Sequence, residues 1–320
     1  MEASEPASVI LIAGATASGK TELAVHLAGR LGGEIVGGDS VQVYRRLDIG
    51  SAKPRPDELR GVRHHVLDMA DIDEAYDAAR FVADADRAIA DIRARGRVPI
   101  VAGGAGLYLR ALVRGLAQGI ASDPDVRARL NAEAASSPEA LAAMHRRLTA
   151  LDPTYAAKIH ANDPIRIVRA FEVMETTGEP ISAHHARHAA QRDRYEVLWV
   201  ALDVERDVLR ARIAARARAM FAAGWLDEVR GVLADGYAPD LKPLRSVGYA
   251  QVVDFVTRGG GGGGGGGEED AIERVRAATV AFAKRQRTWF RGEPGVIWER
   301  PDALRGDAWV ERMRAHVEGK

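Results

Sequence analysis

The chain of 320 residues contains no cysteine. This absence excludes disulfide bonds and thiolate metal sites, and it favours a cytoplasmic protein. No run approaches the roughly 18 apolar residues that a membrane-spanning helix needs, so no membrane partner is expected. The first six residues, Met-Glu-Ala-Ser-Glu-Pro, carry neither a basic group nor an apolar stretch, and they do not predict a signal peptide.

The chain also has a formal net charge of zero, because 45 lysine and arginine residues balance 45 aspartate and glutamate residues. A neutral chain is not expected to coat nucleic acid indiscriminately. A local basic face can still bind phosphates, since the attraction depends on nearby charge. The 47% hydrophobic content is ample for a core, and the length suits one large domain or two modest ones.

The most informative feature that is present is a complete Gly-x-x-x-x-Gly-Lys-Thr loop at residues 14–21. An apolar run predicts a strand before it, and helical spacing follows it. In this context the loop N–H groups and the helix N-terminus point at one small volume, where Lys20 adds a positive charge. We therefore predict a site for a di- or triphosphate. The residues expected to bind it are Gly14, Thr16, Ala17, Ser18, Gly19, Lys20 and Thr21.

Predicted strands and helices alternate over residues 1–120. The strands are expected at 9–13, 34–37, 65–67 and 98–102, and the helices at 20–31, 78–95 and 106–113. Such alternation is typical of a parallel sheet with helices on both faces. Together with the loop it predicts a P-loop NTPase-like α/β fold, in which ligands bind at the carboxyl ends of the strands.

Only helical patterns are present from about residue 122 to 192. Four helices are predicted there, each from a capping residue followed by proline, at Asp123-Pro124, Ser137-Pro138, Asp152-Pro153 and Asp163-Pro164. We predict a first part of the core at 1–121, an all-helical insertion at 122–192, and a core completion with C-terminal helices at 193–320. The last part is expected to hold a strand at 196–203, helices at 205–223 and 270–291, and a flexible poly-glycine loop at 259–267.

Chemistry-bearing residues follow two of the predicted strands. Asp39 and Ser40 come directly after the second strand, where Asp39 has the options of binding Mg²⁺, accepting a proton or capping a helix. Gln42 adds an amide that suits the edge of a base. The strand at 98–102 ends in small residues rather than in the acidic residue that usually organises Mg²⁺ in a P-loop ATPase, which weakens a kinase interpretation.

The segments 14–21, 37–54, 64–68, 101–112, 162–182, 244–251 and 283–291, taken in order, resemble the tRNA dimethylallyltransferase family, that is, the tRNA isopentenyltransferases or IPP transferases. The resemblance covers nearly the whole chain. It implies transfer of a dimethylallyl group from dimethylallyl diphosphate to N6 of the adenosine 3′-adjacent to the anticodon in tRNA, with release of pyrophosphate. The loop then holds a diphosphate, not ATP.

The resemblance also assigns roles to residues. Lys20, together with Mg²⁺ on Thr21, would neutralise the departing pyrophosphate, and Asp39 would accept the proton of the attacking amine. Arg216 looks like the family arginine that contacts the pyrophosphate, although Arg212 and Arg218 are close neighbours. The expected enzyme is a monomer that depends on Mg²⁺.

An adenosine in a stacked loop must be extruded to reach such a site. The insertion would act as the clamp on the anticodon stem, and the basic and aromatic residues between 284 and 291 suit a nucleic-acid groove. The residues expected to contact tRNA are Asp39, Ser40, Val41, Gln42, Ala105, Arg127, Arg166, Arg169, Arg245, Lys284, Arg285, Gln286, Arg287 and Arg291. One departure matters, because Ala105 stands where the family usually has threonine and lacks its hydroxyl.

Three alternatives remain open at this point. The first is an adenylate isopentenyltransferase, which uses a related core on a free nucleotide; the helical insertion and the segment 284–290 favour RNA instead. The second is an ATP-dependent small-molecule kinase, which would need an acidic metal ligand after a core strand. The third is a P-loop RNA-binding module without catalysis, which the alanine at position 105 keeps in consideration.

Overall fold

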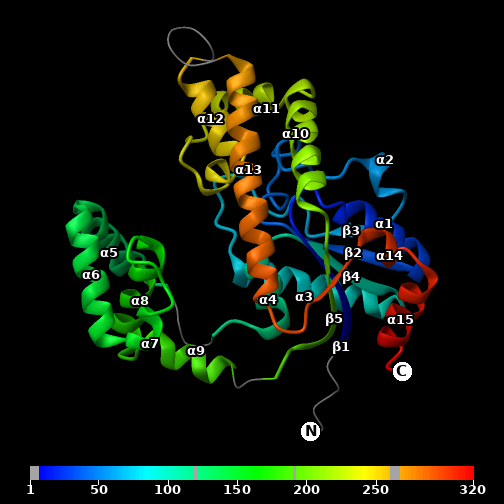
Figure 1. Ribbon diagram of the computed structural model, residues 1–320, viewed down its shortest axis with the longest axis horizontal. Coiled ribbons are helices and arrows are strands. Elements are labelled where there is room, and N and C mark those ends of the chain that lie inside the picture. The colour runs from blue at the N-terminus through cyan, green and yellow to red at the C-terminus, as the bar shows by residue number, and fades with distance from the viewer. Residues whose placement is uncertain (1–6, 118–121, 190–191, 260–266) are drawn as a thin grey trace. The chain divides into compact units, whose positions relative to one another are not determined.

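The structure is a computed structural model that describes residues 7–117, 122–189, 192–259 and 267–320 (Figure 1). The chain divides into two compact units, one formed by Met1–Val113 with Arg194–Lys320 and the other by Arg114–Asp193. The expected poly-glycine loop lies, apart from its two end residues, outside the described residues. None of the helices described here is both long enough and apolar enough to cross a membrane.

The first unit is built on a six-stranded sheet in the order β3-β2-β4-β1-β5-β6, with every pair of neighbours parallel. The strands are β1 (Ala7–Ala13), β2 (Gly33–Gly38), β3 (His64–His65), β4 (Val98–Gly103), β5 (Tyr195–Leu202) and β6 (Ile297–Glu299). Ile10 of β1 lies between Ile100 of β4 and Leu198 of β5. The predicted α/β fold with a parallel sheet is confirmed.

Both faces of the sheet are covered. In β1, Val9 and Leu11 contribute to one core cluster, Ile10 and Ile12 contribute to another, and none of the four is more than 1% exposed. Side chains of α3 (Ala78–Ala94) and α4 (Gly106–Arg114) belong to the first cluster, and those of α1 (Lys20–Leu31) and α15 (Asp307–Val317) to the second. A strand buried on both faces explains the continuous apolar run before the P-loop.

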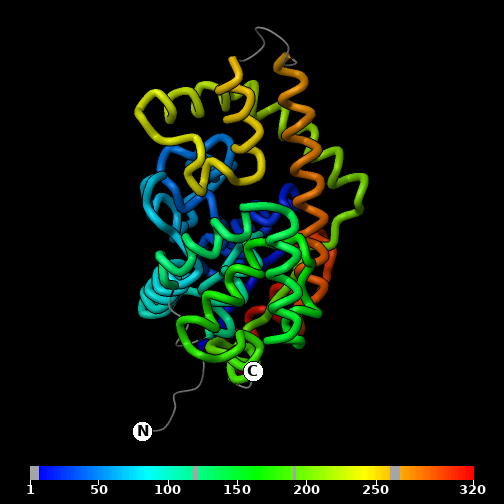
Figure 2. The backbone as a smooth tube through the Cα atoms, turned by 90° about the vertical axis from the view of Figure 1, so that its left-hand side faces the viewer, coloured from blue at the N-terminus to red at the C-terminus, as the bar shows by residue number. Residues whose placement is uncertain are grey.

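Three further helices gather around α13 in the C-terminal part of this unit. Helices α10 (Arg206–Ala222) and α13 (Glu268–Arg291) pack against each other, and α11 (Trp225–Ala234) and α12 (Tyr249–Thr257) pack beside them (Figure 2). The remaining short elements of the unit are α2 (Pro56–Leu59), the 3₁₀ turn η1 (Lys242–Arg245) and α14 (Pro301–Leu304). These helices supply a wall of the site described below.

Strand β3 differs from its prediction in length and position. The sequence predicts a strand at residues 65–67, but β3 is His64–His65. Val66 and Asp68 have φ angles of 63° and 54°, in the left-handed region that no strand accommodates. The chain therefore turns away from the sheet directly after His65.

The second unit is helical and consists of α5 (Pro124–Ser136), α6 (Pro138–Leu151), α7 (Pro153–Ala156), α8 (Pro164–Thr177) and α9 (Ile181–Ala189). The first four helices begin at the four predicted prolines. The side chains of Asp123, Ser137, Asp152 and Asp163 each accept a hydrogen bond from a backbone N–H of the first turn, which satisfies donors that have no partner within the helix. Buried Leu130, Met144, Leu148 and Ile167 contribute to a separate core.

Candidate active site

The P-loop joins β1 to α1 at the carboxyl end of the sheet. Its backbone is left-handed at Ala17, with φ of 61°, and at Gly19, with φ of 93°, which turns successive N–H groups inward. The ammonium group of Lys20 donates to the carbonyl of Ala15 at 2.7 Å, so the lysine is folded back over the loop. Ser18 is buried beneath it. The geometry is that of an anion-binding loop.

The loop opens into a cavity of about 960 Å³. Its lining includes the loop residues from Thr16 to Thr21, Asp39 after β2 and Arg216 of α10. A second cavity of about 350 Å³ shares Thr16, Asp39 and Arg216 with the first and continues between α10 and α13, where Met220 and other apolar side chains line it. The arrangement provides a charged end for an anion and a more apolar end beside it.

Two buried cations, Lys20 and Arg216, interact with each other and with Asp39 in the larger cavity. Burial lowers the pKa of Lys20 to about 8, partly opposed by the negative charge of Asp39 and reinforced by Arg216. Burial also lowers the pKa of Arg216, against the opposing charges of Asp39 and Glu58. Burial disfavours the charged forms of both cations, and a bound polyanion would favour them.

The family resemblance implies that Arg216 contacts the pyrophosphate, with Arg212 and Arg218 as close neighbours on α10, and the structure separates the three. Arg216 lines both cavities. Arg218 is exposed and pairs with Glu269 at 2.5 Å, and Arg212 donates from outside the cavities to the carbonyl of Ser18 at 3.4 Å. Arg216 is therefore the arginine of this helix that faces the P-loop anion site.

Asp39 is oriented by its own backbone. Its Oδ1 accepts hydrogen bonds from the N–H groups of Val41 at 2.8 Å and Gln42 at 3.3 Å. Among the described residues nothing donates to Oδ2, and the residue lines both cavities. A carboxylate that lines a cavity, with one oxygen held by backbone N–H groups, is suited to accepting a proton.

The small residues after β4 allow close approach. A side chain at Gly103 would collide with the backbone of Gly38, and one at Gly104 would come within 2.5 Å of the amide nitrogen of Gln286. Ala105 follows and lines the smaller cavity. The acidic residue after β5, Asp203, pairs with Arg287 at 3.0 Å and lines neither cavity, so no acidic metal ligand of the kinase type ends β4 or β5.

Several residues expected to contact tRNA lie at these cavities. Ser40, Val41, Ala105 and Arg245 line the smaller cavity, and Gln42 lines the larger one. Gln286 lines both, but its side chain is already engaged with the protein, because it accepts from Thr16 N–H and donates to the carbonyl of Gly104.

The basic residues of α13 that are expected to contact tRNA lie along its last turns. Lys284, Arg285 and Arg291 are exposed, and the guanidinium groups of Arg285 and Arg291 stack on Phe282 and Trp298. Arg287 is half-buried and binds Asp203 and the carbonyl of Val204. The first three residues leave positive charge at the surface.

In the helical unit, Arg127 and Arg169 converge on one buried carboxylate. Both bind Oε2 of Glu172, at 2.6 and 2.7 Å, and Glu172 also accepts from the hydroxyl of Ser122. Although burial raises the pKa of Glu172, these hydrogen bonds outweigh it and lower the pKa to about 2. Arg166 is 60% exposed and pairs only loosely with Asp163 at 3.4 Å.

Sequence reasoning missed part of the cavity wall. Lys53, Arg55, Met220 and Phe282 line the larger cavity, yet none was singled out. Helical spacing offered a signal for two of them, since Met220 lies four residues after Arg216 and Phe282 four residues before Gln286, on the same helix faces.

A parallel sheet with a P-loop at its carboxyl edge, followed by a carboxylate that lines the adjoining cavity, defines a P-loop α/β protein with a site suited to a polyanion. The IPP transferase family model matches residues 42–293. A tRNA dimethylallyltransferase of Anaeromyxobacter dehalogenans is 50% identical over 293 residues, which cover 92% of this chain and 95% of that protein. The chain therefore belongs to the IPP transferase family, and the resemblance stated from the sequence is confirmed.

Solved structures agree with this assignment. The tRNA isopentenylpyrophosphate transferase of Bacillus halodurans matches with a TM-score of 0.69 and 34% identity, covering 98% of this chain and 97% of that one. A eukaryotic dimethylallyltransferase acting on tRNA matches with a TM-score of 0.75 and 26% identity, covering 97% of this chain and 78% of that one.

Proposed function

We propose that this protein transfers a dimethylallyl group from dimethylallyl diphosphate to N6 of the adenosine 3′-adjacent to the anticodon in tRNA, and releases pyrophosphate. Family membership and the relatives that carry this activity support the reaction class. The observation that carries the chemistry is that Lys20, Arg216 and Asp39 line one cavity at the P-loop.

In the proposed reaction, N6 of the adenosine attacks C1 of the dimethylallyl group. The C1–O bond breaks, and its electron pair leaves with the pyrophosphate. Lys20 and Arg216 stabilise the negative charge that grows on this leaving group, in a site where burial strengthens their effect. The proton released from N6 passes to Oδ2 of Asp39, which accounts for all atoms and charges of the step.

The residues present fit a magnesium ion. Mg²⁺ prefers oxygen ligands and commonly combines one or two protein groups with substrate phosphates and water. Thr21 and Asp39 bring a hydroxyl and a carboxylate to the larger cavity, while no three His, Asp or Glu side chains form a closed cage in the described part of the chain. Thr21 would hold the ion beside the diphosphate, and the ion would supply further charge neutralisation.

The tRNA is proposed to contact the mouth of the smaller cavity, the exposed cations of α13 and the helical unit, which would clamp the anticodon stem. Exposed Arg166 and the Arg127–Arg169 pair support a phosphate-binding face on that unit. A monomeric enzyme and a cytoplasmic location are part of the same proposal.

The test is incubation with undermodified tRNA, labelled dimethylallyl diphosphate and Mg²⁺. Label is expected in RNA, and Asp39→Asn is expected to lower kcat by about 10³-fold because the base is lost while its backbone hydrogen bonds can persist. Asp57→Asn is the matched control, since Asp57 is a mostly exposed carboxylate at the rim of the same cavity.

Other outcomes identify other functions. Label in AMP but not in RNA would indicate a nucleotide prenyltransferase. Phosphate transfer from ATP without prenyl transfer would indicate a kinase. Tight tRNA binding with no transfer would indicate a binding module.

A further inference from the structure

The loop that follows Asp39 forms a wall of both cavities, since Asp48, Ile49 and residues 51–55 line the larger one and Gly50 and Ser51 line the smaller one. Gln42 closes this loop on itself, because its Nε2 donates to the carbonyl of Ser51 at 3.1 Å and to that of Ala52 at 3.0 Å. The N–H of the same Gln42 donates to Oδ1 of Asp39. The position of residues 48–52 is thus linked, through one side chain, to the orientation of the carboxylate that faces the cavities.

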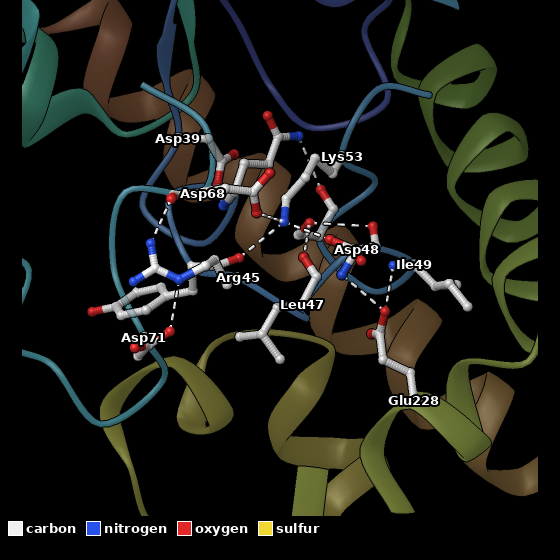
Figure 3. Close-up of polar contacts among 12 residues, drawn as sticks. Asp39, Arg45, Leu47, Asp48, Ile49, Lys53, Asp68, Asp71 and Glu228 are labelled. Carbon is white, nitrogen blue, oxygen red and sulfur yellow. Dashed lines mark hydrogen bonds and ion pairs between the residues drawn. The ribbon is translucent and has the colours of Figure 1, made fainter. Parts of the chain in front are cut away.

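Glu228 of α11 binds three backbone N–H groups of this loop (Figure 3). Its Oε2 accepts from the N–H groups of Asp48 at 2.8 Å and Ile49 at 2.6 Å, and its Oε1 accepts from the N–H of Gly50 at 3.2 Å. Successive N–H groups that converge on an anion form a nest, and a carboxylate of the chain itself occupies this one. The hydroxyl of Tyr249 donates to Oε1 at 2.7 Å. In the described part of the chain, no cation pairs with Glu228.

Packing fixes the loop at the same place. A side chain at Gly50 would collide with the ring of Trp225, and one at Gly248 would come within 2.8 Å of that ring. The loop backbone therefore lies directly on the start of α11. Buried Tyr249 has a raised pKa, because of burial and the negative charge of Glu228, and it stays a hydrogen-bond donor.

Lys53 provides a second attachment of the loop that follows Asp39. Its ammonium group donates to the carbonyl of Tyr44 at 2.9 Å and to carboxylate oxygens of Asp48 and Asp68, both at 2.5 Å, and its side chain is only 8% exposed (Figure 3). The loop is therefore clamped at two points, by a cation from within and by a carboxylate from α11.

We propose that Glu228 is a positioning residue for the transfer reaction. It lines neither cavity and contacts no reacting atom. It fixes residues 48–50, and through Gln42 it keeps Oδ2 of Asp39 directed at the cavities. This role rests on the proposed function. A carboxylate is required because all its lone pairs accept, whereas the amide of glutamine would turn an N–H donor toward at least one N–H group of the loop.

The decisive variant is Glu228→Gln, compared with Asp227→Asn. Asp227 is the preceding residue of α11, is 81% exposed and pairs only with Arg230, so its substitution tests the loss of a charge from the same turn. We expect Glu228→Gln to lower kcat for prenyl transfer about 10- to 100-fold, with KM for dimethylallyl diphosphate within about threefold, and Asp227→Asn to change neither. Glu228→Asp, which keeps the charge, is expected to recover part of the lost kcat.

A double variant tests the route. If Glu228 acts through Gln42, then combining Glu228→Gln with Gln42→Ala lowers kcat no further than the more damaging single variant. Additive losses, or a kcat for Glu228→Gln equal to that of Asp227→Asn, would overturn the proposal. If Glu228 had a purely structural role, Glu228→Gln would lower the melting temperature and the active fraction without lowering kcat per active site.

Hydrogen exchange gives a reading that needs no substrate and separates this proposal from the proposed function. In Glu228→Gln, exchange is expected to accelerate at the N–H groups of residues 48–50 and also at Val41 and Gln42, whose N–H groups are bonded to Asp39. Acceleration confined to residues 48–50 would refute the link to Asp39, even in a protein that transfers no prenyl group. If the wild type transfers no prenyl group but Glu228→Gln still accelerates exchange at residues 48–50, Val41 and Gln42, only the proposed function would be rejected.

Discussion

The side chain of Gln286 accepts a hydrogen bond from the backbone N–H of Thr16 at 2.8 Å, which attaches α13 to the P-loop. Its Nε2 donates to the carbonyl of Gly104 at 2.9 Å, so one buried amide also joins the loop after β4. A residue that orders three segments around the anion site should govern binding of the diphosphate.

Gln286→Glu is expected to raise KM for dimethylallyl diphosphate by about 10- to 100-fold. The substitution keeps the shape but replaces the donor toward Gly104 with an acceptor and adds a negative charge near the anion site, and an unsatisfied buried group costs about 1–3 kcal/mol. Steady-state kinetics with Thr288→Ala, an exposed change on the same helix, provide the comparison. Equal KM values for the two variants would show that the amide does not organise the loop.

Lys20 should give donor binding a distinctive pH dependence. Its pKa in the folded protein is about 8, so the ammonium is present below pH 8 and is lost as the pH rises through that value. We expect kcat/KM for dimethylallyl diphosphate to fall about tenfold per pH unit above pH 8, because the neutral amine no longer attracts the diphosphate. Saturating donor should shift the fall in kcat to higher pH, since a bound polyanion stabilises the charged form.

The control for this profile is Lys20→Arg, whose guanidinium stays charged throughout the range. Its kcat/KM is expected to be lower than that of the wild type but independent of pH between 8 and 10. A wild-type profile that is equally flat would mean that the ammonium is not needed in its charged form.

Arg216 and Arg218 lie two residues apart on α10 and allow a paired test. Arg216→Ala is expected to lower kcat about 100-fold, because the arginine lies where charge develops on the leaving group. Arg218→Ala removes an exposed pair with Glu269, and such pairs contribute about 0–1 kcal/mol, so its kcat is expected within twofold of the wild type. Equal losses for both would contradict the assignment.

Ala105 offers a gain-of-function test. Its side chain lines the smaller cavity, at the position where the family resemblance implies a threonine hydroxyl. Ala105→Thr is expected to raise kcat about tenfold if that hydroxyl donates a hydrogen bond in the transition state. Ala105→Val has nearly the same shape without the hydroxyl and should show no gain. A gain in both variants would indicate packing rather than hydrogen bonding.

Local signals in the sequence account for much of the fold. Helix α1 has the predicted bounds because Gly19 and Gly32 place left-handed backbone at its two ends. The proline-initiated helices were predictable for the same kind of reason. Strand β6 was not, because its three residues are half-buried throughout and show no alternation. Short edge strands are set by pairing with a distant strand, here β5.

The candidate site, like the fold, was predictable from the sequence only in part. The P-loop and Asp39 follow from motifs, whereas Glu228 lies 178 residues from Gly50 in the sequence, and no local pattern connects them. Helical periodicity placed Arg212, Arg216 and Arg218 on one helix but could not choose among them, since the choice depends on what packs against each face. Tertiary contacts therefore determine which of these residues belong to the site.

The chain leaves the first unit after Val113 and re-enters it at Arg194. Within that unit the N–H of Arg194 donates to the carbonyl of Val113 at 2.7 Å, and its guanidinium donates to that of Leu112 at 3.1 Å. The chain therefore departs and returns through adjoining positions, as an inserted module does. Lengthening, trimming or exchanging this module would leave the walls of both cavities in place, because every residue that lines them belongs to the first unit.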